Sequence, residues 1–107
     1  SDKKAIELYE MAAKRGNAVA QYNLGIFYDQ GIHGLTQSSE RAIEYYTLAA
    51  NQGIPDAQVS LGIMYANGDG IETSYSKARE WFTKAAAQGH DYAINGLKEL
   101  DENGLHV

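Results

Sequence analysis

Residues 20–31 read AQYNLGIFYDQG, and residues 57–68, 37 positions later, read AQVSLGIMYANG. The stretch SSERAIEYYTLAANQG at 38–53 recurs as SYSKAREWFTKAAAQG at 74–89, with a spacing of 36. The two spacings differ because the first loop carries one extra residue. Self-similarity at a fixed period of this length is the signature of a protein built from stacked repeats.

The repeat continues at both edges of the chain. Residues 1–16, SDKKAIELYEMAAKRG, match the second half of the unit, and residues 91–104, DYAINGLKELDENG, match the first half weakly. The chain is therefore expected to form one repeat domain over residues 1–107. It divides into a half unit at 1–16, full repeats at 18–53 and 55–89, and a second half unit at 91–107.

Each unit is predicted to contain two helices. In the first, Ala57, Leu61 and Tyr65 recur every four residues, and in the second, Trp81 and Phe82 belong to a wide apolar stripe. Serines precede the second helices, where a hydroxyl can cap the backbone, and glycines follow them. We expect helices at about 2–15, 18–30, 39–52, 56–67, 75–88 and 91–102. Six helices in antiparallel pairs predict an all-α fold, a right-handed α/α solenoid of helix-turn-helix repeats.

The pattern A-x-x-x-L-G-x-x-Y-x-x-G-x-G, followed by K-A-x-x-W-F-x-K-A-A-x-x-G, resembles the Sel-one-like repeat, a short relative of the tetratricopeptide repeat. The residues that carry the resemblance are Ala57, Leu61, Gly62, Tyr65, Gly68, Gly70, Lys77, Ala78, Trp81, Phe82, Lys84, Ala85, Ala86 and Gly89. The resemblance implies a superhelix that serves as an adaptor for protein complexes. In some secreted bacterial members a cysteine pair cross-links each repeat, whereas this chain has no cysteine.

The two edges of the chain depart from the family pattern in different ways. Lys98 and Asp101 replace the motif glycine and tyrosine in the last half unit, so 91–102 is expected to be a capping helix. Ser1 aligns with the capping serines of the other units, so the chain starts in the middle of a unit. Our hypothesis is that it is a fragment of a longer repeat protein.

Composition argues against several classes of partner. The 107 residues hold 9 Lys and Arg against 14 Asp and Glu, a net charge of −5, which does not favour nucleic-acid binding. No apolar run is long enough to predict membrane insertion, and no leader is visible. A cytoplasmic location is the default expectation. Without cysteine there is neither a disulfide nor thiolate chemistry.

The motifs that could carry chemistry have structural explanations. Ser74–Lys77 and Ser1–Lys4 match S-x-x-K, the signature of serine acyl-enzymes. The equivalent residues in the other unit are Ser38 and Arg41, so a recurring helix cap with a basic residue explains the motif better. An acyl-enzyme of this type remains a remote alternative.

Metal and cofactor sites have equally weak support. The three histidines, His33, His90 and His106, show no metal-ligand spacing. The Gly68-x-Gly70 pair lacks the context of a phosphate loop. We therefore expect no catalytic residue, no metal and no cofactor.

Candidate binding residues are those on the first helix of each unit that the packing motif does not use. In tetratricopeptide-like solenoids these helices line the concave face. The predicted groove residues are Tyr22, Ile26, Asp29, Val59, Ile63, Asn67, Asn95 and Glu99. Alternatively, Ile26 and Ile63 pack between successive first helices. The set carries no Lys or Arg, so the expected ligand has apolar anchors and some positive charge.

Together these features predict a non-enzymatic protein-protein interaction adaptor that binds a peptide or partner domain on its concave face. The alternative is a structural spacer or self-association segment of a larger repeat protein.

Overall fold

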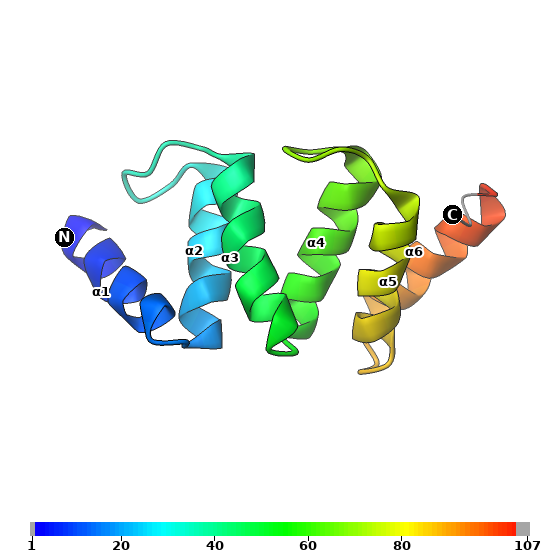
Figure 1. Cartoon of the computed structure of the whole chain (residues 1–107), viewed down its shortest axis with the longest axis horizontal. Helices are drawn as coiled ribbons and strands as arrows, with labels where there is room; N and C mark the ends of the chain where they lie inside the picture. The colour runs from blue at the N-terminus through cyan, green and yellow to red at the C-terminus, as the bar shows by residue number, and fades with distance from the viewer. Residues whose placement is uncertain (1, 105–107) are drawn as a thin grey trace.

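The computed structural model describes residues 2–104. Ser1, the first residue of the candidate motif Ser1–Lys4, lies outside this range, as do His106 and the end of the last half unit. The described chain is all helical and contains no strand. Its helices are α1 (Asp2–Lys14), α2 (Ala18–Gln30), α3 (Ser39–Asn51), α4 (Pro55–Asn67), α5 (Tyr75–Ala86) and α6 (Asp91–Glu102). Each helix packs mainly on the one before it and the one after it, along an elongated array (Figure 1). The prediction of an all-α repeat solenoid is confirmed.

The ends of the helices follow from local chemistry. Ser38 and Ser74 cap α3 and α5, and their hydroxyls accept hydrogen bonds from the backbone N–H groups of Arg41 and Lys77, both at 3.2 Å. Helix α4 begins at Pro55, one residue earlier than expected, because proline suits the first helical turn. Helix α2 ends at Gly31, whose φ of 64° is the left-handed conformation that glycine adopts at least cost.

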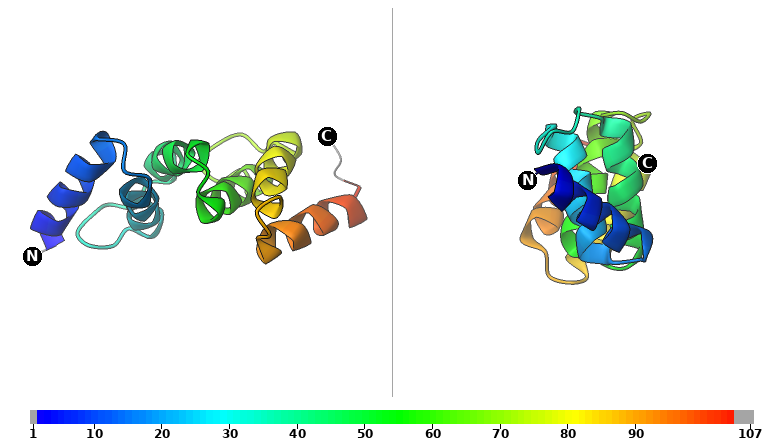
Figure 2. Two further views of the ribbon diagram at one scale, coloured as in Figure 1. Left: turned by 90° about the horizontal axis from the view of Figure 1, so that it is seen from below. Right: turned by 90° about the vertical axis from the view of Figure 1, so that its left-hand side faces the viewer.

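A first helix such as α2 or α4 contributes to the core on two sides. Leu24, which is fully buried, packs with Ile6 and Ala13 of the preceding α1. On its other side α2 meets the cluster formed by α3 and α4, whose members include Tyr46 and Leu61. Helices α1 and α6 lie at the two ends of the array, so each has a neighbour on one side only (Figure 2).

Close approach between a first helix and its partner depends on glycine. A Cβ placed on Gly25 would lie 2.5 Å from the ring of Tyr46, and one on Gly62 would lie 2.6 Å from the ring of Phe82. Cβ atoms do not approach other carbons this closely, because dense interiors leave no room for overlap. The Leu-Gly pair that defines the sequence repeat is therefore the position where an aromatic side chain of the second helix lies directly against backbone.

Buried glutamines link successive units. Gln21 and Gln58 are each 4% exposed, and their side-chain amides donate to the carbonyl oxygens of Ala13 and Ala50, both at 3.1 Å. Gln88 in turn donates to the side-chain oxygen of Gln58 at 3.2 Å. These bonds satisfy polar groups that would be costly to bury alone.

The glutamine pairing was not predicted, although the sequence carries a signal for it. Gln52, the counterpart of Gln88, donates to the side-chain oxygen of Gln21 at 2.9 Å. Gln21 and Gln58 recur at the repeat spacing, and so do Gln52 and Gln88. In α6 the equivalent position is Ile94, which is 48% exposed, so the pairing is not continued there.

Candidate functional site

The predicted groove residues of α2 and α4 belong largely to the packing between units. Val59 is 7% exposed and lies in the cluster formed by α4, α5 and α6, so its expected place in an open groove is corrected to the core. Tyr22, Ile26 and Ile63 are half-buried and pack against clusters formed by the second helix of their own unit and the first helix of the next. The reason is that a solenoid helix has a neighbour on both sides, and the stripe beside the packing motif faces the second helix of its own unit and the first helix of the next. Ile26 and Ile63 therefore contribute to inter-helix packing and also retain exposed surface.

The same stripe on α6 is open to solvent. Asn95 and Glu99 are exposed, and so is Lys98 between them on this face. These three residues occupy the repeat positions that Val59, Gly62 and Ile63 occupy on α4. The last predicted residue of α4, Asn67, is also exposed. The exposed part of the predicted set is thus concentrated on α4 and α6.

A polar cluster involving Asp29 lies between α2, α3 and α4. The hydroxyl of Tyr46 donates to the Asp29 carboxylate at 3.4 Å, and the rings of Tyr46 and Tyr22 have centroids 5.8 Å apart. Burial raises the pKa of Tyr46 well above its usual range, and the nearby Asp29 carboxylate raises it further. Burial and the charge of Asp69 likewise raise the pKa of Asp29, partly offset by its hydrogen bond from Tyr46. Keeping the Asp29 carboxylate ionised in the folded protein therefore costs free energy of folding.

Replacing Asp29 with asparagine should stabilise the protein at neutral pH by less than about 1 kcal/mol, because it removes this cost at a partly solvated site. Since the folded-state pKa is raised above the ordinary value of 3.8, the folded state binds the proton more tightly than the unfolded state. The contribution of Asp29 to stability therefore falls as pH rises through the range just above 3.8. Urea unfolding of both proteins at pH 3.5 and pH 7 tests this. If the wild type and Asp29→Asn differed in free energy of unfolding by the same amount at both pH values, the pKa of Asp29 would not be raised in the folded state.

A pocket of about 130 Å³ lies between the first helices α4 and α6. It joins three of the predicted residues, Ile63, Asn67 and Glu99. The other residues that line it are Ala66, Phe82, Tyr92, Gly96 and Leu100. We call it the α4–α6 pocket. Its buried part is apolar, and the Asn67 amide and the Glu99 carboxylate lie at its polar side.

Two of the lining residues, Tyr92 and Gly96, were not predicted from the sequence. Tyr92 is 56% exposed, at a position where the other units have Val19 and Asp56. A large aromatic residue at a variable, solvent-facing position is the signal that could have identified it. Gly96 lies against the ring of Phe82, where an added Cβ would come within 3.2 Å, so the absence of a side chain helps the pocket form.

The S-x-x-K motif has the geometry of a helix cap. The Ser74 hydroxyl accepts the Lys77 backbone N–H, and the Lys77 ammonium lies 5.5 Å from the centre of the Tyr65 ring. Arg41 lies at the same distance over Tyr28 in the other unit, so the cation–aromatic contact recurs with the cap. Within residues 2–104 no group of three His, Asp or Glu side chains is placed to hold a metal ion.

Comparison with known proteins places the repeat in a family. Three consecutive segments, residues 1–17, 18–54 and 55–90, match the Sel1 repeat. The chain belongs to the Sel1 repeat family. This match confirms the resemblance stated from the motif. Members of this family are generally protein-interaction modules and typically non-catalytic scaffolds.

Two solved structures of Sel1 repeat proteins are similar to this member over 97% of its length, each at 32% identity. One is a protective antigen of uropathogenic Escherichia coli with a TM-score of 0.93, and the other is a Sel1 repeat protein from Oxalobacter formigenes with a TM-score of 0.88. The chain spans only 22% and 42% of these two proteins. No curated protein matches its sequence.

A third structure, Helicobacter pylori cysteine-rich protein B, shares the fold at 23% identity and a TM-score of 0.82. The match covers 89% of this Sel1 repeat chain and 71% of that protein. Among the helices of residues 2–104, none is both long and apolar enough to cross a membrane.

Proposed function

We propose that this Sel1 repeat chain is a non-enzymatic adaptor that binds a peptide or partner domain on the face built by the first helices, α2, α4 and α6. The observation that carries the proposal is the α4–α6 pocket, which brings Ile63, Asn67 and Glu99 together beside the exposed ring of Tyr92. Pockets with an apolar lining and a few polar groups are typical binding sites.

The chemistry of the α4–α6 pocket defines the expected ligand. Phe82 and Leu100, which are 4% and 6% exposed, form its apolar part, and a volume of about 130 Å³ suits one side chain. Glu99 and the Asn67 amide stand beside it and can accept hydrogen bonds from a cation. The ligand we propose presents a large apolar residue next to a lysine or arginine.

Peptides selected by display against the wild-type protein should be enriched in such pairs. Glu99→Lys should weaken binding of a selected peptide about tenfold or more, which corresponds to about 1.4 kcal/mol, because it replaces attraction by repulsion. Tyr92→Ala should have a similar effect through lost aromatic contact. Isothermal titration calorimetry on folded variants measures both.

The matched control is Leu48→Ala, which removes an apolar side chain of similar exposure, 48%, from the second helix α3. We expect it to bind selected peptides as the wild type does. Selected peptides that bind Glu99→Lys and Tyr92→Ala with unchanged affinity would rule out the α4–α6 pocket as the site.

A further inference from the structure

A polar network links the first helices α2 and α4 through α3. The hydroxyl of Tyr46 donates to the Asp29 carboxylate at 3.4 Å, and the rings of Tyr46 and Tyr22 have centroids 5.8 Å apart. The hydroxyl of Ser60 on α4 is a hydrogen-bond partner of both tyrosines. Tyr46 is 3% exposed, and the other three residues are half-buried. We call these four residues the α2–α4 network, because they occupy the space where α2, α3 and α4 meet.

The repeat places a different set of side chains at the same four positions of the next unit. Each member of the network is replaced by a residue whose side chain has no polar atom. The replacements, at the repeat spacings of 37 and 36, are Val59 for Tyr22, Ala66 for Asp29, Phe82 for Tyr46 and Gly96 for Ser60. Three of them, Ala66, Phe82 and Gly96, line the α4–α6 pocket. The pocket therefore lies where the preceding unit has its polar network.

The loss of side-chain atoms accounts for the open space. Compared with the α2–α4 network, Ala66 lacks a carboxylate, Phe82 lacks a hydroxyl, and Gly96 lacks a side chain altogether. Close-packed proteins normally fill the space between helices with side chains. Between α4 and α6 a pocket of about 130 Å³ is left instead, with Glu99 at its polar side. One of two equivalent spaces is thus filled by the chain itself, and the other is open to a ligand.

We propose that Ala66, Phe82 and Gly96 are the specificity-determining residues of the α4–α6 pocket, and that they select a peptide which inserts a phenylalanine next to an arginine or lysine. This deepens the proposed function and rests on it, because the pocket is the same. The cation of the ligand lies beside Glu99, and its aromatic ring enters the space that the network fills in the preceding unit.

Tyrosine is the informative competitor of phenylalanine. In the α2–α4 network a hydroxyl finds a carboxylate and a second hydroxyl as hydrogen-bond partners. Ala66, Phe82 and Gly96 offer no such partner, and burying a hydroxyl without one is costly. The pocket therefore prefers the ring that lacks a hydroxyl, although the two rings have nearly the same shape.

The first test uses the whole chain and two blocked dipeptides, acetyl-Phe-Arg-amide and acetyl-Tyr-Arg-amide. In a nuclear magnetic resonance titration the Phe-Arg probe should shift the backbone signals of Ile63, Tyr92 and Glu99. It should bind at least about fivefold more tightly than the Tyr-Arg probe, because only the tyrosine buries an unpaired hydroxyl. Equal affinity of the two probes would overturn the proposed selection of phenylalanine.

The second test closes the pocket by copying the network into it. The triple variant Ala66→Asp/Phe82→Tyr/Gly96→Ser should bind the Phe-Arg probe at least about tenfold more weakly, because the new side chains occupy the pocket. The added carboxylate would strengthen binding of this cationic probe if charge alone decided affinity, so a loss reports occlusion. Circular dichroism confirms folding. If the triple variant does not fold, Ala66→Asp/Phe82→Tyr serves instead, with a loss of at least about fivefold.

The reverse exchange should create a second site. Asp29→Ala/Tyr46→Phe/Ser60→Gly removes the α2–α4 network, so the Phe-Arg probe should then shift the signals of Ile26 and Gln30, which hold the repeat positions of Ile63 and Asn67. In the wild type these two signals should not move. Absence of the new shifts in the folded variant, or their presence in the wild type, would show that the network does not decide which space binds.

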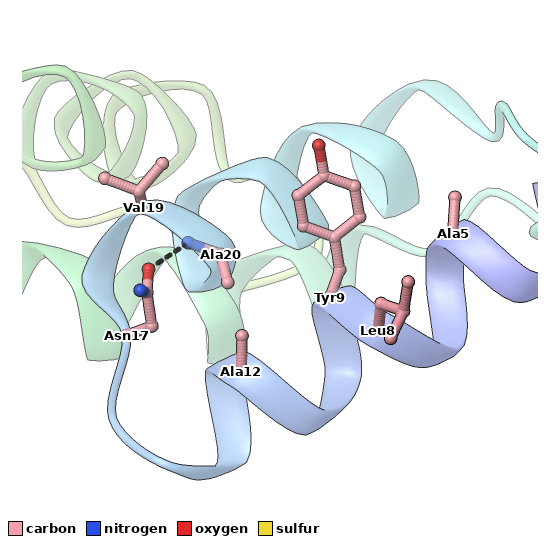
Figure 3. Close-up of a pocket in the computed structure, with 7 residues that line it drawn as sticks. All are labelled: Ala5, Leu8, Tyr9, Ala12, Asn17, Val19 and Ala20. Carbon is pink, nitrogen blue, oxygen red and sulfur yellow. Dashed lines mark hydrogen bonds between the residues drawn. The ribbon is translucent and has the colours of Figure 1, made fainter.

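A larger apolar groove between α1 and α2 provides a reference within the same titration. It has a volume of about 460 Å³, and its lining includes Leu8 and Val19 (Figure 3). The closing substitutions lie on α4, α5 and α6, so they should leave any probe shifts at Leu8 and Val19 unchanged.

The outcomes separate the two proposals. If the Phe-Arg probe leaves the signals of Ile63, Tyr92 and Glu99 unmoved in the wild type, the α4–α6 pocket is not a binding site, and the proposed function fails with it. If those signals shift equally in the wild type and in the folded closing variant, the pocket binds, but Ala66, Phe82 and Gly96 do not determine its specificity.

Discussion

Replacing Phe82 with alanine should lower the free energy of unfolding by about 3 to 5 kcal/mol. Phe82 is 4% exposed and its ring lies against the backbone of both neighbouring first helices, at Gly62 of α4 and Gly96 of α6. Because glycines supply no side-chain atoms, neither helix can refill the space that the ring leaves. The cavity therefore cannot collapse easily, which places the expected loss at the upper end for a core substitution.

Urea and thermal unfolding followed by circular dichroism measure this loss. A protein of this size has a total stability of roughly 5 to 15 kcal/mol, so the melting temperature should fall by more than about 10 °C. Leu48→Ala is the control, since it truncates a large apolar side chain that is 48% exposed, and we expect a loss below about 1 kcal/mol. Equal losses for the two variants would mean that the α4–α5–α6 cluster does not dominate stability.

The sequence predicts this part of the fold well because repetition supplies information that one helix alone does not. Gly62 and Phe82 recur as Gly25 and Tyr46, and a residue that recurs at the repeat spacing performs the same packing in each unit. The helix boundaries follow equally from local signals, such as the capping Ser74. The end of α5 was predicted two residues too late, because the helix ends at Ala86 and Gly89, whose φ is 83°, lies beyond two turn residues.

The candidate binding site is predicted less well, for a physical reason. The helical period identifies which residues share a face, but not whether that face meets solvent or the next unit. Val59 and Ile63 share a stripe, yet Val59 is core and Ile63 reaches the α4–α6 pocket. Tyr92 was missed because its place in the lining of the α4–α6 pocket depends on how α6 lies beside α4, a spatial relation that periodicity does not specify.

Replacing Gly62 with leucine should lower the free energy of unfolding by about 3 kcal/mol, although leucine is the better helix former by about 0.8 kcal/mol. Packing outweighs propensity because a Cβ at this position would lie 2.6 Å from the Phe82 ring, and leucine adds three further carbons there. Asn67→Leu, at an exposed position at the end of α4, should change the free energy of unfolding by less than about 0.5 kcal/mol.

The two substitutions at this contact should rescue one another. In the double variant Gly62→Leu/Phe82→Ala, the leucine side chain enters the space that the ring has left, so bulk is moved from α5 to α4 while the total volume changes little. We expect a coupling energy of about 2 kcal/mol in a double-mutant cycle, which leaves the double variant more stable than the sum of the single losses implies. Additive losses would show that Gly62 and Phe82 do not meet as the repeat requires. The direct contact between backbone and aromatic ring would then not explain why the Leu-Gly pair recurs.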